Sequence, residues 1–250
     1  MQAIPEILKA EEPFLQARNS TPKSSMTGQE SECPDCSDTG WVPIDSADGY
    51  GKVRMCECEK RRRSEERIRV VLQDWPEYKD ASLATLKPRN VGQANAITAI
   101  RGDPYGSYFI TGYFSRGKTS LLVAQYKFLA LAGEKCLLRS MRDLMKELQK
   151  AEISPNSDRE AFESPVLQMV NLAPRAHLLI DDVEKAPVRS GFRAETLFNL
   201  LDVIKRRMLG LSVTSNLPMI SKDPGKPDLR KYLGEEVVSR LYRICRAIEL

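Results

Sequence analysis

The 250-residue sequence has no long hydrophobic run and no strong excess of charge of one sign. No apolar stretch approaches the ~20 residues that span a lipid bilayer, so we expect no membrane-crossing segment. The first twenty residues carry Glu6, Glu11 and Glu12 and lack the basic start and apolar core of a secretory signal, so we expect a cytoplasmic protein. A net charge of +4 permits contact with nucleic acid without requiring it.

Histidine is almost missing, since His177 is the only one, and this argues against chemistry based on a nucleophile–histidine triad. Four of the six cysteines cluster within residues 33–58 at the spacing of metal ligands, which favours a reducing compartment over disulfides. The other two, Cys136 and Cys245, lie in apolar segments that we expect to be strands, where they should be buried core residues.

Composition divides the chain into three parts. Residues 1–30 end in a segment with the composition of a linker, so we expect a flexible terminus there. A short helix that docks a partner is the open alternative. Residues 31–73 hold the cysteine module and a charged helical connector. Residues 74–250 have the length and composition of the main domain.

From residue 74 onward, apolar strand patterns alternate with helical patterns. This alternation predicts a three-layer α/β domain in which helices cover both faces of a parallel sheet. The expected strands are 108–111, 135–139, 177–180, 211–214 and 244–250, and the expected helices are 92–100, 120–131, 141–151, 194–208 and 235–242.

A glycine-rich loop lies between the first of these strands and the helix that follows. It fits the pattern Gly-x4-Gly-Lys-Ser/Thr, in which glycines let backbone amides converge on an anion and the helix adds its positive end. Lys118 should reach the terminal phosphates of ATP, and Thr119 should offer its hydroxyl to Mg²⁺. The predicted ATP-binding residues are Gly112, Tyr113, Phe114, Ser115, Arg116, Gly117, Lys118, Thr119, Ser120 and Asp181.

Two positions of the loop depart from the common pattern. Ser115 stands where many such loops have glycine, so its backbone is strained if the position requires positive φ. Arg116 stands where a small residue is common, and it either contacts a phosphate or points to solvent.

An apolar strand downstream of the loop ends in two carboxylates, Asp181 and Asp182. Asp181 is expected to hold Mg²⁺, directly or through water, together with Thr119. Asp182 is expected to orient or deprotonate the attacking water.

Two further polar residues are candidates for the same chemistry. Asn216 follows the next strand, where its amide either touches the γ-phosphate or the attacking water, or serves as a turn residue. Arg240 lies on a helical segment near the C-terminus, where it either reaches a γ-phosphate of a neighbouring subunit or is a surface arginine.

The cysteine module contains two close pairs of thiols, Cys33 with Cys36 and Cys56 with Cys58, on either side of a segment typical of a hairpin. Two such knuckles can close a tetrahedral zinc site with four thiolate ligands. Because all four ligand positions are filled by protein, the predicted role of Zn²⁺ is structural.

The order of these parts resembles the DnaC/DnaI-type replicative helicase loaders, which are AAA+ ATPases. The resemblance covers residues from about 33 to 250 and is most specific near the C-terminus. The segments that carry it are the cysteine module up to Cys56–Glu59, then Pro76–Leu83, Gly112–Thr119, Leu179–Asp182, Thr214–Leu217 and Leu233–Leu241.

The resemblance implies an AAA+ P-loop domain that binds ATP and single-stranded DNA, and an N-terminal region that grips a hexameric replicative helicase during the initiation of DNA replication. It also implies self-association into an ATP-dependent oligomer. Asn216 matches the first sensor of the family, and Arg240 matches its trans-acting arginine, although Arg243 lies close by.

Two other functions stay open at this point. Transposition helper ATPases of insertion elements (the IstB type) are similar across the same ATPase motifs and act on duplex DNA. A nucleotide-gated adaptor with little hydrolysis is the second alternative, because Ser115 and Arg116 disturb the loop. The candidate DNA contacts are Arg139, Arg142, Arg189, Arg193, Lys205, Arg206 and Arg207.

Overall fold

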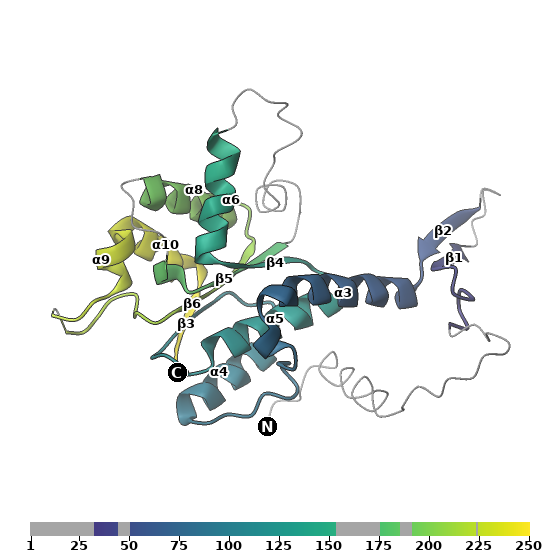
Figure 1. Cartoon of the computed structure of the whole chain (residues 1–250), viewed down its shortest axis with the longest axis horizontal. Helices are drawn as coiled ribbons and strands as arrows, with labels where there is room; N and C mark the ends of the chain where they lie inside the picture. The colour runs from purple at the N-terminus through teal and green to yellow at the C-terminus, as the bar shows by residue number, and fades with distance from the viewer. Residues whose placement is uncertain (1–32, 45–50, 154–175, 186–191, 224) are drawn as a thin grey trace.

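A computed structural model describes residues 33–44, 51–153, 176–185, 192–223 and 225–250 (Figure 1). The flexible terminus or docking helix expected in residues 1–30 lies outside these ranges. Within them, no helix combines the length and the apolar character needed to cross a lipid bilayer.

A five-stranded sheet forms the centre of the larger part of the described chain (Figure 1). The strands follow the order β4, β5, β6, β3 and β7, and every neighbouring pair is parallel. All carboxyl ends of the strands therefore meet at one edge, where a parallel sheet binds its ligands. The strands are β3 (Tyr108–Thr111), β4 (Lys135–Ser140), β5 (Ala176–Asp181), β6 (Gly210–Ser215) and β7 (Arg246–Glu249).

Helices cover both faces of the sheet, because successive side chains of its strands point to opposite sides. In β5, Leu178 and Ile180 pack among the residues of one hydrophobic cluster, and Leu179 between them packs in another. The first face is covered by α6 (Met141–Ile153), α8 (Phe192–Arg206), α9 (Leu229–Leu233) and α10 (Glu235–Ile244), and the second by α3 (Glu57–Val71), α4 (Val91–Gly102) and α5 (Lys118–Leu131).

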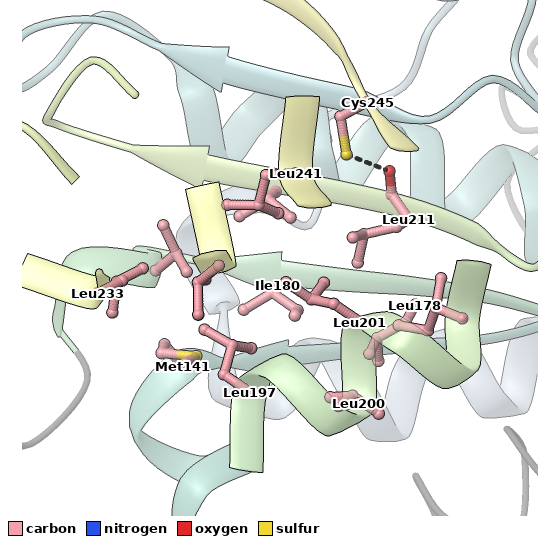
Figure 2. Packing of buried hydrophobic residues seen from close by; sticks show 14 of the residues in the cluster. Met141, Leu178, Ile180, Leu197, Leu200, Leu201, Leu211, Leu233, Leu241 and Cys245 are labelled. Atoms are coloured by element: carbon pink, nitrogen blue, oxygen red, sulfur yellow. Dashed lines mark hydrogen bonds between the residues drawn. The ribbon is translucent and has the colours of Figure 1, made fainter. Parts of the chain in front are cut away.

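Figure 2 shows the core on the first face, where leucines of α8, α9 and α10 pack against β5 and β6. Cys245, which follows α10, donates its Sγ hydrogen to the carbonyl oxygen of Leu211 at 3.4 Å. This side chain is buried, as expected, but it lies at the end of a helix instead of in a strand. Cys136 does lie in a strand, β4, and is half-buried.

The predicted strand over residues 244–250 is wrong at its start. Helix α10 continues through Ile244, and β7 begins only at Arg246. The apolar residues Val237, Leu241 and Ile244 repeat at helical spacing, so the helix keeps one buried face up to that residue. The other expected helices and strands of the domain are present, whereas α9 was not expected.

The connector helix α3 belongs partly to the core of the larger domain. Ile68 near its C-terminus packs in one buried cluster with Trp75 and with Tyr126 and Leu129 of α5. Two short 3-10 helices, η2 (Leu72–Asp74) and η3 (Pro76–Tyr78), follow α3 and lead the chain along this face. The charged half of α3 lies nearer the cysteine module and is stabilised by Glu–Arg pairs such as Glu59 with Arg63.

His177 in β5 is buried as a neutral side chain. Its Nε2 lies 3.0 Å from Oγ of Ser212, and a Cβ at Gly210 would stand 2.1 Å from its Nδ1, so glycine is required beside it. Burial lowers the pKa of His177 to about 3.

This buried histidine makes stability depend on pH. Between the unfolded pKa of about 6.5 and the folded value, only the unfolded chain binds the proton, so stability falls as pH falls. We expect the free energy of unfolding of the wild type to drop by about 1.4 kcal/mol more per pH unit than that of His177→Gln below about pH 6. Urea unfolding from about pH 6 to about pH 5 measures this, and equal slopes for the two proteins would contradict it.

Candidate nucleotide site and cysteine cluster

The loop between β3 and α5 has the backbone of an anion cradle. Gly117 has φ 79° and Ser115 has φ 59°, so the serine does adopt the positive φ that glycine would tolerate better. Nε2 of Gln93 in α4 donates to the carbonyl oxygen of Arg116 at 2.6 Å, which fixes the loop from outside. A Cβ at Gly117 would lie 2.7 Å from that same Nε2, so a side chain cannot replace the glycine without displacing the anchor.

The three largest side chains of the loop are exposed to solvent. Tyr113 and Phe114 are each 73% exposed, and Arg116 is exposed as well. Within the part of the chain that the structure describes, their side chains make no hydrogen bond or ion pair with the polar groups of the candidate site, so the predicted role of these residues rests on their main-chain groups.

Lys118, the first residue of α5, is buried in the loop with its ammonium fully hydrogen-bonded. Its Nζ donates to the carbonyl oxygens of Gly112 and Tyr113 at 2.9 Å each and to Oδ1 of Asn216 at 2.7 Å. Burial lowers the pKa of Lys118, and the nearby carboxylates of Asp182 and Glu184 act in the opposite direction. All three ammonium hydrogens are used, so a phosphate at this position would have to displace one of these oxygens.

Thr119 and Asp181 lie together beside Lys118. The Thr119 hydroxyl donates to the Asp181 carboxylate at 3.1 Å, and Thr214 of β6 donates to the same carboxylate at 2.6 Å. Burial raises the pKa of Asp181, and the hydrogen bond from Thr214 opposes this shift. A hydroxyl and a carboxylate are ligands that suit Mg²⁺, and a cation would favour the charged form of the buried Asp181.

Asp182 occupies a strained turn directly after β5. Its φ is 55°, and its backbone nitrogen donates to Oγ1 of Thr214 at 2.9 Å. Its carboxylate forms an ion pair with Lys185 at 2.6 Å, and Nδ2 of Asn216 lies 3.4 Å from the other carboxylate oxygen. The expected carboxylate thus lies at the site, tied to a cation that the sequence analysis did not single out.

Asn216 connects this group of residues, because it contacts both the lysine and the acidic turn. Besides Lys118 and Asp182, it contacts Glu184 of the 3-10 helix η4 (Val183–Lys185), where Nδ2 donates to Oε1. Sequence reasoning missed Glu184; the available signal was a third carboxylate two residues after Asp182. Three segments at the carboxyl edge of the sheet, the start of α5, the end of β5 and the end of β6, bring together the predicted residues Lys118, Thr119, Asp181, Asp182 and Asn216.

No family model matches the chain, and no curated protein matches it. Among solved structures, the crystal structure of the DnaC helicase loader is similar at 23% identity and a TM-score of 0.57, covering 70% of this chain and 98% of that one. The crystal structure of DnaI shares 21% identity at a TM-score of 0.50, covering 69% of this chain and 89% of that one. AMPPCP-bound DnaA from Aquifex aeolicus shares 19% identity at a TM-score of 0.51, covering 69% of this chain and 51% of that one.

The chain has an AAA+ fold. The parallel sheet and its two helical layers confirm the predicted αβα architecture, and the resemblance to DnaC/DnaI-type loaders is confirmed at the level of the fold.

Arg240 lies on a different part of the AAA+ fold from the loop. Its guanidinium stacks 3.8 Å from the ring centroid of Phe198 in α8 and lies 3.6 Å from Oδ1 of Asp202. Its Nε is buried and has no partner among the described residues. Among the described residues, Arg240 therefore contacts α8 and not the candidate nucleotide site of the same chain. Arg243 is exposed.

The candidate DNA contacts of the AAA+ fold are dispersed. Arg139 pairs with Glu147 at 3.2 Å, and Arg206 pairs with Asp202 at 2.9 Å. Arg142, Lys205 and Arg207 are exposed. Arg189 and the side chain of Arg193 lie outside the described residues, so the structure selects no DNA-binding surface from this set.

The four cysteines of the N-terminal module converge. Their sulfur atoms all lie within 4.8 Å of one another, with Cys33 and Cys56 3.7 Å apart and Cys36 and Cys58 3.4 Å apart. The hairpin of β1 (Trp41–Ile44) and β2 (Lys52–Met55) joins the two pairs.

This arrangement fits a tetrahedral zinc ion. Zn–S bonds of about 2.3 Å place sulfur atoms about 3.8 Å apart, close to the separations seen here. Backbone hydrogen bonds from Cys36 and Asp35 lower the pKa of Cys33 to about 7, which favours a thiolate there, whereas the contact with the Cys36 thiol raises the pKa of Cys58. The four-cysteine cluster is consistent with the predicted zinc module.

We expect Cys36→Ser to release the metal and unfold the module, because structural zinc contributes its binding free energy to folding. Zinc content of the purified protein, measured by mass spectrometry, should fall from about one ion per chain to none. The control is Cys136→Ser, which changes a cysteine outside the cluster and should keep the ion. Full zinc content in Cys36→Ser would contradict the assignment.

Proposed function

We propose that this protein is an ATP-dependent helicase loader that acts in the cytoplasm during the initiation of DNA replication. In this proposal the N-terminal region binds a hexameric replicative helicase, and the AAA+ domain, residues 74–250, binds ATP and single-stranded DNA. One observation carries the ATP-binding part: at the carboxyl edge of a parallel sheet, Lys118 is hydrogen-bonded to Asn216 and the adjacent Thr119 to Asp181.

Each of these residues has a defined role in the proposal. Lys118 and the backbone amides of the loop bind the phosphates, while Thr119 and Asp181 hold Mg²⁺. Asp182 accepts a proton from the attacking water or orients it, and the Asn216 amide contacts the γ-phosphate or that water.

The loader assignment is supported by similarity to the DnaC helicase loader over 98% of that chain. Binding of a nucleotide is supported by the similarity to DnaA in its AMPPCP-bound form. A structural Zn²⁺ held by Cys33, Cys36, Cys56 and Cys58 orders residues 31–73 for contact with the helicase, and residues 1–30 extend this contact region.

Self-association is part of the proposal. The planar guanidinium of Arg240 suits the γ-phosphate of a neighbouring subunit. In the free chain this group is occupied by Phe198 and Asp202, so assembly must release it from α8.

A nucleotide-gated adaptor with little hydrolysis is the second candidate. Its specific support is the 2.6 Å ion pair between Lys185 and Asp182, which neutralises the carboxylate that the attacking water needs. The loader and the adaptor are both expected to bind ATP, and they differ in the expected rate of ATP hydrolysis.

Two variants test the nucleotide site. Lys118→Ala removes a charge-assisted contact to phosphate, so the dissociation constant for Mg-ATP should rise about 100-fold. Asp182→Asn should keep the wild-type affinity and lower turnover about 100-fold, because the proton acceptor is lost while Lys118, Thr119 and Asp181 are unchanged. Fluorescent-nucleotide titration and phosphate release measure both, and wild-type values in both variants would refute the site.

Helicase binding distinguishes the loader from the other functions. Mixed at micromolar concentration with the replicative helicase of the same source, the protein and the helicase should elute together on gel filtration when ATP is present. The module variant Cys36→Ser should lose this co-elution. ATP-dependent filaments on duplex DNA without helicase affinity would instead indicate a transposition helper.

A further inference from the structure

Glu184 is a carboxylate at the nucleotide site to which no motif assigns a role. It lies in η4, directly after the acidic end of β5. Its Oε1 accepts a hydrogen bond from Nδ2 of Asn216, and its Oε2 is buried with no partner among the described residues.

The Asn216 carboxamide has only one orientation that satisfies its neighbours. Lys118 can only donate hydrogen bonds, and the carboxylate of Glu184 can only accept them. Oδ1 therefore faces Lys118 and Nδ2 faces Glu184, as the structure has it. The result is a continuous chain of hydrogen bonds from the ammonium of the phosphate loop to Glu184.

This chain changes when Lys118 binds a phosphate. In the structure, the ammonium donates its three hydrogens to oxygens of Gly112, Tyr113 and Asn216. A phosphate oxygen must therefore displace one of these three oxygens. Gly112 and Tyr113 contribute backbone carbonyls of a loop that Gln93 anchors, whereas Asn216 contributes a side chain. A side chain moves more easily than an anchored backbone, so Oδ1 of Asn216 is the oxygen that the phosphate displaces. Once Lys118 releases Oδ1, the Asn216 amide keeps two contacts, both through Nδ2. One is the hydrogen bond to Glu184, and the other is the longer contact of 3.4 Å to Asp182.

We propose that Glu184 is a positioning residue that holds the Asn216 carboxamide in place when Lys118 leaves it for a phosphate. Glu184 acts through Asn216 and needs no contact with the nucleotide. The inference rests on the proposed ATP turnover, in which Asn216 touches the γ-phosphate or the attacking water.

The test compares two substitutions of Glu184. Glu184→Ala removes the acceptor and should lower kcat for ATP hydrolysis about 10-fold or more, with KM changed less than about twofold. Glu184→Gln keeps an oxygen that can accept from Nδ2, so its kcat should stay within about threefold of the wild type. Glu65→Ala, which removes an exposed carboxylate on α3, is the matched control and should leave both constants unchanged.

Coupling to Asn216 separates positioning from a general loss of structure. Asn216→Ala should lower kcat as Glu184→Ala does, and the double variant should lose no more than either single one. Additive losses would overturn the proposal. A Glu184→Gln variant as impaired as Glu184→Ala would also overturn it, because the charge and not the hydrogen bond would then matter.

A spectroscopic measurement tests the same inference without hydrolysis. With the non-hydrolysable analogue AMPPCP and Mg²⁺ bound, the side-chain amide signal of Asn216 should be sharp in the wild type and Glu184→Gln and broadened in Glu184→Ala. Identical signals in all three proteins would refute the positioning role. A wild type that binds the analogue but does not hydrolyse ATP would refute the proposed turnover, while the amide signals would still decide the role of Glu184.

Discussion

The ammonium of Lys118 is the group on which the rest of the site depends. It is buried at the start of α5, and its hydrogen bonds go to two loop carbonyls and the oxygen of one side-chain amide. Such a buried cation is costly without partners, and the partners come from the loop and from the end of β6. The position of Lys118 thereby fixes that of Asn216, and through it the acidic turn after β5.

Most of the architecture could be predicted from the sequence, because the signals are local. Alternating strand and helix patterns define the parallel sheet, and the loop pattern at the end of β3 requires glycine where φ is positive, as at Gly117. The four cysteines also converge as their spacing indicates. The helix-to-strand boundary at Ile244 was misjudged because a short apolar run fits either period.

Interactions between distant segments could not be read in the same way. The stacking of Arg240 on Phe198 depends on how α8 and α10 are placed in three dimensions. Glu184 is an ordinary acidic residue in sequence, and only its hydrogen bond with Asn216 distinguishes it. In the proposed function, Lys118 and Arg240 would have to exchange these protein contacts for contacts with a nucleotide.

Calorimetric titration of Mg-ATP into the zinc-loaded wild-type protein tests the central claim most directly. If the loop amides and Lys118 bind a triphosphate, the titration should give a saturable heat of binding at one site per chain. The melting temperature should also rise when Mg-ATP is present. No heat of association and no thermal protection in well-folded protein would contradict the assignment of this edge of the sheet as a nucleotide site.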